Sequence, residues 1–285
     1  MGGIIWLASY PKSGNTWFRV FLANLRGDQE KAANINELHS TPIASARGIF
    51  DEEVGVEASD LTPDEIERLR PEVYEKLAGD TDETLFMKVH DAYTLVEGKT
   101  PLFPKSATRG AIYIIRNPLD VAVSFAHHWG WNYDRAISEM ADENAAFCSK
   151  TKRLQDQLRQ KLLTWSGHVK SWTEQTAFPV CILRYEDMKQ RPAKTFSRAV
   201  RFAGLDHSGE EIEKALSLCT FEELQRQERE NGFHEKSPSS EMFFRKGEVD
   251  GWREELSDMQ VARVILDHRS VMARFEYLKG DGPVP

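Results

Sequence analysis

A lysine, a serine and a glycine stand between two apolar segments near the start of the sequence, within SYPKSGNTW at residues 9–17. The apolar run at 4–8 predicts a buried strand, and residues 16–25 carry apolar side chains at helical spacing. A strand, a tight turn and a helix present backbone N–H groups and a positive helix end to an anion. Lys12 adds a charge, and Gly14 allows close approach of the backbone. The stretch predicts a phosphate-binding loop, although a turn with an exposed lysine has the same local pattern.

The order of residues in this loop differs from that of the common nucleotide loop, G-x-x-x-x-G-K-[ST], where the lysine follows the second glycine. Here the lysine precedes the glycine, and this disfavours an ordinary ATPase or kinase. Short side chains beside the glycine can donate further hydrogen bonds to a bound phosphate, namely those of Ser13, Asn15 and Thr16.

Two later motifs supply further cations. In YIIRNPLDVAVSF, a predicted strand ends at Arg116, a capped helix follows, and Ser124 lies on its second turn. Arginine can bind a phosphate bidentately, and a serine hydroxyl can add a hydrogen bond. In FFRKGEVDGWR, two cations, Arg245 and Lys246, precede Gly247. Each motif by itself equally suits a surface salt bridge or a solvated basic turn.

Together the three motifs resemble the cytosolic-type sulfotransferase family in order, spacing and strand context, over roughly residues 4 to 253. The resemblance implies the cofactor 3′-phosphoadenosine 5′-phosphosulfate (PAPS), which leaves as its desulfated product PAP. It implies that the 5′-phosphosulfate is held by Lys12, Ser13, Gly14, Asn15 and Thr16. The 3′-phosphate would be held by Arg116, Ser124, Arg245, Lys246 and Gly247.

Three aromatic residues match the family's contacts with the adenine end of the cofactor: Trp17 in the loop motif, Tyr185 in LRYEDM and Phe221 in CTFEEL. Without the family, Trp17 and Phe221 suit core packing equally well. Cys219 stands where relatives often have threonine, and it receives no predicted contact.

His90, in LFMKVHDAY, follows a predicted strand where the family has its catalytic base. An imidazole with an ordinary pKa of ~6.5 can accept the proton of an acceptor hydroxyl near neutral pH. Lys12, Arg116 and Tyr185 also lie at or just past the carboxyl ends of predicted strands, where ligands of open parallel sheets bind. We expect in-line displacement at sulfur, with Lys12 stabilising the leaving oxygen and no metal required.

By analogy with relatives, Ser124 holds Lys12 away from the bridging oxygen until the acceptor binds. Lys88, which shares the strand face of His90, could assist the transfer. One departure from the family is Asp250-Gly251, where relatives have Gly-Asp, and this could shift the loop after Gly247. The dimer motif of animal members is not evident, so a homo-oligomer stays open and its interface is unknown.

The 285 residues predict one α/β domain at 1–278 with a flexible tail at 279–285. Strands are expected at 4–8, 85–89, 111–115 and 180–183, forming a central parallel sheet with helices on both faces, a P-loop-like nucleotide fold. Helices are expected at 16–25, from Asn117-Pro118, and at 59–69, 150–172, 192–203, 209–218 and 257–275. Pro42, Pro63 and Pro71 are expected to break structure in 28–82, and 225–244 is expected to be a mobile loop.

Composition narrows the partners. A net charge of −8 disfavours nucleic-acid binding, and no apolar run approaches the ~20 residues that span a bilayer. The three scattered cysteines suggest a reducing cytoplasm. The expected acceptor is a small-molecule hydroxyl compound. Two alternatives stay open: a nucleotide kinase-like P-loop enzyme, and a module that binds PAPS or PAP without catalysis. Aromatic residues around the second insertion hint at an apolar or phenolic acceptor, though they suit a core equally: Phe125, Trp129, Trp131, Tyr133 and Phe147.

Overall fold

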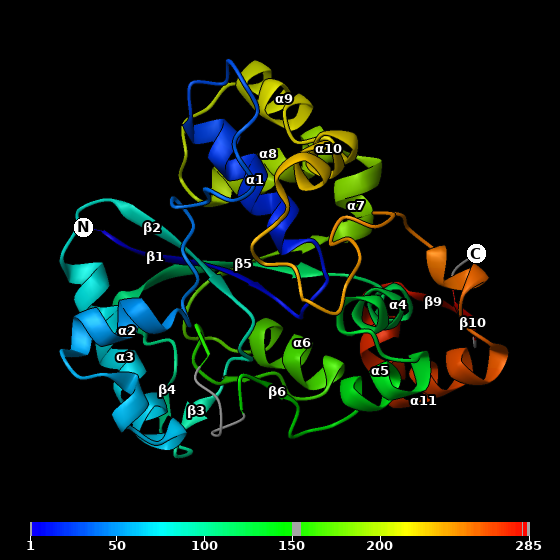
Figure 1. The fold of residues 1–285 in the computed structure, drawn as a ribbon, viewed down its shortest axis with the longest axis horizontal. Coiled ribbons are helices and arrows are strands. Elements are labelled where there is room, and N and C mark those ends of the chain that lie inside the picture. Colours follow the sequence, from blue (N-terminus) through cyan, green and yellow to red (C-terminus); the bar gives the residue numbers. More distant parts are fainter. Residues whose placement is uncertain (1, 150–154, 281, 284–285) are drawn as a thin grey trace. The chain divides into compact units, whose positions relative to one another are not determined.

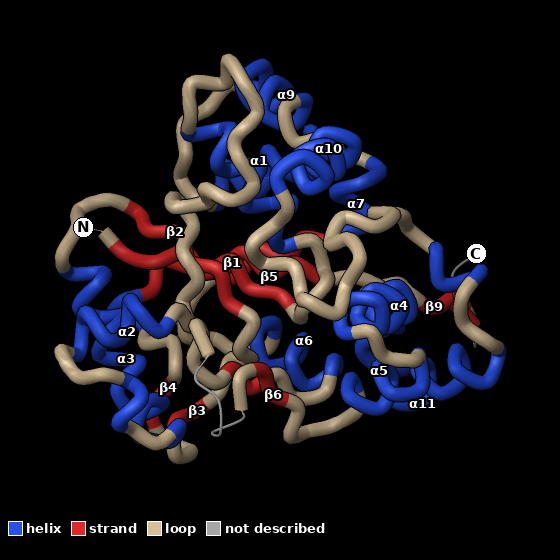
Figure 2. Tube along the Cα trace, viewed as in Figure 1, coloured by secondary structure: helices blue, strands red, loops and turns tan. Residues whose placement is uncertain are grey.

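The computed structural model describes residues 2–149, 155–280 and 282–283 (Figures 1 and 2). The chain forms two compact units, each assembled from three stretches of sequence. The first contains Met1–Tyr10, Ser40–Tyr113 and Asp142–Ile182, and the second contains Pro11–His39, Ile114–Ala141 and Leu183–Pro285. The chain thus passes from the first unit to the second near the carboxyl ends of three strands.

The central sheet has the strand order β2-β1-β5-β8 and confirms the predicted α/β fold. Its strands are β1 (Gly3–Ser9), β2 (Thr84–Val89), β5 (Thr108–Ile115) and β8 (Val180–Arg184). β1 and β2 are parallel, with Gly3 opposite Thr84 and Ala8 opposite Val89. Every residue of β1 is buried, because helices flank the sheet and cover its apolar run.

The first unit adds helices and short hairpins around these strands. The helices are α2 (Arg47–Val54), η1 (Ala58–Asp60), α3 (Pro63–Gly79), η2 (Lys105–Ala107) and α6 (Trp165–Thr173). β3 (Leu95–Val96) pairs with β4 (Thr100–Pro101), and β6 (Ala146–Phe147) pairs with β7 (Gln160–Lys161), both antiparallel.

Two predicted helices of the first unit differ from the structure. The helix expected at 59–69 starts at Pro63, because Thr62 and Glu65 form a capping box there. It continues to Gly79, beyond its predicted end. Pro71 lies inside this helix and lacks the N–H of one helical hydrogen bond. The burial of the helix's apolar face, which includes Ile66 and Val73, offsets the cost of that missing bond. The helix expected at 150–172 is wrong at Gln160–Lys161, a strand, and its first five residues lie outside the described part of the chain.

The second unit is mainly helical. α1 (Asn15–Arg26), α8 (Pro192–Phe202) and α9 (Gly209–Ser217) pack together, and so do α4 (Pro118–Trp129), α5 (Tyr133–Met140) and α11 (Asp258–Arg274) (Figure 1). The remaining elements are α7 (Tyr185–Gln190), α10 (Phe221–Asn231), η3 (Gly251–Glu254), and the paired β9 (Leu278–Lys279) and β10 (Gly282–Pro283).

The mobile loop expected at 225–244 is wrong over its first part, which continues α10. Thr220 caps this helix, and a buried face at Leu224 and Gln227 outweighs its polar composition. The tail beyond 278 forms the short hairpin as far as it is described, and residues 281, 284 and 285 lie outside that part. No described helix has both the length and the apolar character needed to cross a bilayer.

Candidate active site

The loop after β1 has the backbone geometry of an anion site. Lys12 has φ 66° and Gly14 has φ 103°, so left-handed residues flank Ser13 at the start of α1. No side chain caps the start of α1 at Gly14, and the first turn of a helix is the end that carries the positive pole of its dipole. Gly14 is required sterically, since a Cβ there would lie 2.6 Å from Cδ2 of Tyr185. Asn15 and Thr16, the other predicted phosphate ligands here, are buried in the first turn of the helix.

Arg116 joins this loop to the RKG segment. Its Nη1 donates to the Lys12 carbonyl (3.2 Å), and its Nη2 donates to the Glu248 carbonyl (2.8 Å). The guanidinium lies 4.4 Å from the centroid of the Tyr185 ring. Ser124 is half-buried on the second turn of α4, as predicted from the sequence. Arg116 therefore holds two backbone segments at a fixed distance from each other.

The predicted adenine residues gather around Gly247. The Tyr185 hydroxyl donates to the Gly247 carbonyl (2.9 Å), and Gly247 has φ 64°. A Cβ on Gly247 would lie 2.4 Å from Cε2 of Phe221, so only glycine allows this approach. Trp17 contacts the edge of Tyr185 at a centroid distance of 6.1 Å. Lys189, which belongs to none of the motifs recognised in the sequence, places its Nζ 5.7 Å from the ring centroids of both Trp17 and Phe221.

Cys219 and Phe125 differ in what they contribute. The Cys219 backbone carbonyl accepts a hydrogen bond from Trp17 Nε1 (3.0 Å), and this contact needs no particular side chain at 219. Phe125 is completely buried, so it packs in the core and does not line an acceptor surface. Trp129 and Trp131 stack on each other (5.8 Å) and are only half-buried.

The two cations of the RKG segment are engaged by a carboxylate that the sequence analysis missed. Arg245 Nη1 lies 2.8 Å and Lys246 Nζ 3.2 Å from Glu255 Oε1. The other carboxylate oxygen accepts hydrogen bonds from Tyr133 and from His127 Nε2 (3.1 Å). Partial burial opposes ionisation, but these hydrogen bonds hold the pKa of Glu255 well below its ordinary value. Glu255 therefore stays charged near neutral pH.

The segment after Gly247 keeps a left-handed turn without glycine. Asp250 has φ 64°, at the position where the resemblance leads us to expect glycine. Asp120, on the first turn of α4, accepts hydrogen bonds from the N–H groups of Asp250 (3.0 Å) and Trp252 (3.1 Å). Burial raises the pKa of Asp120. The charge of Arg116 and the hydrogen bonds from the two N–H groups act in the opposite direction and only partly offset this rise. The left-handed backbone at Asp250 is strained for a residue other than glycine, and the two hydrogen bonds to Asp120 hold the turn in this conformation.

His90 belongs to the first unit and follows β2 directly. Its Nδ1 lies 2.9 Å from the Ser9 carbonyl oxygen, an acceptor only, so this nitrogen carries the proton. The neutral imidazole then has its lone pair on Nε2, which is the nitrogen able to accept a proton. His168 donates from Nε2 to the His90 carbonyl (3.0 Å), and burial lowers the pKa of His168 to about 4.

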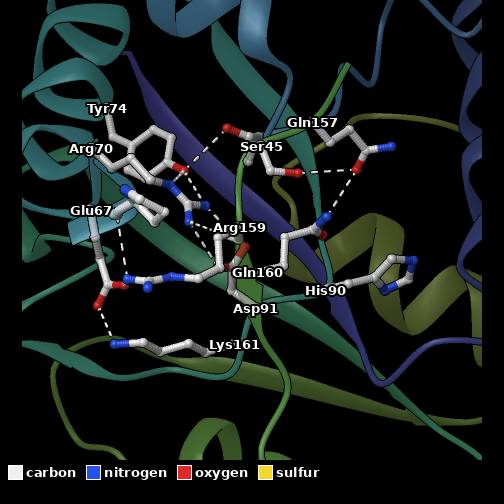
Figure 3. Close-up of polar contacts among 12 residues, drawn as sticks. Ser45, Glu67, Arg70, Tyr74, His90, Asp91, Gln157, Arg159, Gln160 and Lys161 are labelled. Atoms are coloured by element: carbon white, nitrogen blue, oxygen red, sulfur yellow. Dashed lines mark hydrogen bonds and ion pairs between the residues drawn. The ribbon is translucent and has the colours of Figure 1, made fainter. Parts of the chain in front are cut away.

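A buried polar network surrounds the residue after the histidine (Figure 3). Arg70 and Asp91 form an ion pair in which both side chains are 2% exposed. The sequence contained one signal for it, a charged residue immediately beside the expected base. Its partner on α3 could not be found, because pairing 21 residues apart depends on the packing of that helix. Among the described residues, no cluster of three or more His, Cys, Asp or Glu side chains is arranged to hold a metal ion.

Two observations test whether an anionic nucleotide fits the loop of the second unit. Ser13 Oγ is buried and has no hydrogen-bond partner within the described residues, and the same holds for Arg116 Nε. Buried polar atoms are normally satisfied, so unsatisfied donors beside a glycine cradle indicate a ligand with acceptor oxygens. The fold and this loop are those expected of an α/β protein whose ligand carries a phosphate and binds at the carboxyl ends of the strands.

Comparison with known proteins identifies the family. Residues 4–276 match the family described as "Sulfotransferase domain", and the chain belongs to this family. It is 26% identical to cytosolic sulfotransferase 13 of Arabidopsis thaliana, covering 89% of this chain and 72% of that relative. It is 26% identical to flavonol 3-sulfotransferase of Flaveria bidentis, covering 91% and 78%. The chain is therefore a sulfotransferase, and the kinase-like and purely binding alternatives are set aside.

Solved structures agree on the fold. Mouse sulfotransferase SULT7A1 complexed with PAP superposes with a TM-score of 0.60 at 20% identity, over 95% of this chain and 84% of that one. Retinol dehydratase in complex with androsterone and inactive cofactor PAP gives 0.61 at 20% identity, over 94% and 80%.

Proposed function

We propose that this enzyme transfers the sulfuryl group of PAPS to a hydroxyl of a small-molecule acceptor, with His90 as general base. The donor is PAPS, which supplies the activated sulfuryl group when bound. The observation that carries the proposal is the hydrogen bond from His90 Nδ1 to the Ser9 carbonyl, because it leaves Nε2 as the basic nitrogen. This is the arrangement that proton removal from a hydroxyl requires.

The cofactor is held by residues of the second unit. Lys12, Gly14 and the backbone at the start of α1 receive the 5′-phosphosulfate, with Ser13 Oγ as a further donor. Asn15 and Thr16 complete this set from the first turn of α1. The 3′-phosphate contacts are Arg116, Ser124, Arg245, Lys246 and Gly247, and the adenine contacts are Trp17, Tyr185 and Phe221.

Lys12 stabilises the negative charge that grows on the oxygen leaving sulfur. Its Nζ lies 3.6 Å from the centroid of the Phe243 ring in this structure. The ring face attracts the ammonium group electrostatically and so favours this position of the half-buried Lys12 side chain. His90 meanwhile accepts the acceptor's proton at Nε2, so that the new oxygen–sulfur bond forms as the proton leaves.

The acceptor is a small molecule with a hydroxyl group. This class is supported by the relatives and structural neighbours, which include a flavonol sulfotransferase and a retinol dehydratase in complex with androsterone. The half-buried Trp129 and Trp131 pair offers an aromatic surface that favours an apolar or phenolic acceptor. A cytoplasmic location is part of the proposal and accords with the cytosolic sulfotransferase among the relatives.

The proposal is tested by incubating the purified enzyme with sulfur-labelled PAPS and a panel of flavonols, simple phenols, sterols and sugars. We expect labelled product from a phenolic or sterol acceptor, formed equally well with and without a chelator. Release of PAP without transfer to any hydroxyl compound would contradict the proposed reaction, and loss of activity with chelator would contradict its metal independence.

A further inference from the structure

The backbone that follows His90 is held at successive positions by other elements of the first unit. The His90 carbonyl accepts from His168 Nε2 (3.0 Å), and the Asp91 carbonyl accepts from Trp172 Nε1 (2.9 Å), both on α6. The N–H of Ala92 donates to a carbonyl of β7 (2.7 Å). These bonds hold the peptide groups from α6 and β7, and a further contact, through the side chain of Asp91, attaches the same backbone segment to α3.

That contact is the ion pair between Arg70 on α3 and Asp91 (Figure 3). Arg70 Nη1 and Nη2 donate to the two carboxylate oxygens of Asp91 at 2.8 and 2.9 Å. Its Nε and Nη2 also donate to the Tyr74 hydroxyl (3.0 and 2.8 Å), and Nη1 donates to the Arg159 carbonyl (3.1 Å). Every N–H of the guanidinium is thus used, so the orientation of Asp91 is determined from both sides of its carboxylate.

The hydroxyl of Tyr74 strengthens this arrangement. Burial raises the pKa of Tyr74 to about 12, so the hydroxyl keeps its proton and donates it to the Ala44 carbonyl (3.1 Å). A buried ion pair of this kind contributes little net stability, because desolvation of both charges offsets their attraction. We therefore expect the ion pair to fix the positions of the groups around it and to contribute little to the free energy of unfolding.

We infer that Arg70 and Asp91 are a positioning pair, which acts through the backbone to hold the imidazole of His90 in the orientation needed for proton removal. The inference rests on the proposed role of His90. The pair touches neither cofactor nor acceptor in this account, and it acts on turnover and not on cofactor binding. Small displacements of a reacting group cost large factors in rate, so the pair should matter strongly for kcat.

The test is the double variant Arg70→Met/Asp91→Leu, which removes both charges together and keeps apolar volume at both positions. A single substitution would leave an unpaired buried charge and risk unfolding, whereas the double change is often neutral for stability. We expect a Tm within a few degrees of wild type, kcat lower by about 10- to 100-fold, and an unchanged Kd for PAP.

A matched control is Lys76→Met/Glu53→Leu, which removes a partly exposed ion pair (2.8 Å) between the same helix, α3, and α2. We expect it to keep wild-type kcat. Wild-type kcat in the Arg70/Asp91 variant would overturn the inference, and so would an equal loss of kcat in the control. If His90→Ala itself retains full turnover, the proposed function fails instead, so the two failures are distinguishable.

Discussion

Gly247→Ala should weaken PAP binding by displacing the ring of Phe221. The added Cβ would lie 2.4 Å from Cε2 and 2.5 Å from Cδ2 of that ring, whereas ordinary van der Waals contact begins at 3.4 Å. The ring must therefore move by about 1 Å or the backbone must yield. If Phe221 stacks on the adenine, loss of most of that contact costs about 1–3 kcal/mol. The dissociation constant for PAP should then rise about 5- to 150-fold.

The left-handed backbone is a separate cost that a control must remove. Gly247 has φ 64°, and an alanine in that region costs roughly 1–2 kcal/mol of folding free energy. Gly55→Ala carries the same cost, since Gly55 has φ 73° at the end of α2, but its Cβ would meet no atom within 4 Å. Titration calorimetry with PAP and thermal unfolding should be measured for both variants.

We expect both variants to lose stability and only Gly247→Ala to lose PAP affinity. Wild-type affinity in Gly247→Ala, with the protein folded, would refute the placement of Phe221 at the adenine. An equal loss of affinity in Gly55→Ala would refute the steric argument, because that glycine has no neighbour for its Cβ to displace.

Two further outcomes follow from charged and buried groups. Glu255→Gln should raise PAP affinity by up to about fivefold, because it releases Arg245 for the 3′-phosphate and leaves Lys246 with the exposed Glu254 (3.5 Å). Calorimetry showing unchanged affinity would contradict this. The second concerns His168, whose pKa is about 4 in the fold against 6.5 as its ordinary value. In the unfolded chain His168 is protonated below pH ~6.5, whereas in the fold it stays neutral down to pH ~4. The free energy of unfolding is therefore unaffected by His168 above pH ~6.5 and falls by about 3 kcal/mol as the pH is lowered from ~6.5 to ~4. Urea unfolding of wild type and His168→Gln at pH 7 and 4.5 should show a smaller pH effect in the variant, and equal effects would contradict the burial argument.

The fold was largely predictable, because its strands are short and almost wholly apolar. The predicted strand at 4–8 lies within β1, and the predicted helix at 209–218 matches α9 to one residue. The helix expected at 150–172 failed because apolar spacing there reflects burial of separate short elements, such as α6 after Thr164. α10 was missed because its charged residues dominate its composition, although Thr220 was an available cap signal.

The positions of several candidate site residues were predictable for a different reason, and their roles stay predictions. Lys12, Arg116 and Tyr185 all lie where strands end, and the order of such residues is visible in the sequence. The residues that form ion pairs with these side chains or with their neighbours could not be predicted from the sequence. Glu255 lies ten residues after Arg245 in the sequence, and Asp91 lies 21 after Arg70, so both pairs depend on packing that local patterns do not encode.

Removal of the acceptor's proton by His90 is tested by comparing turnover and cofactor binding in His90→Ala with those of wild type. We expect loss of sulfuryl transfer from labelled PAPS, with a PAP dissociation constant close to that of wild type. His39→Ala, at an exposed histidine, should keep both properties and serves as the control. Near wild-type kcat in His90→Ala would contradict the claim.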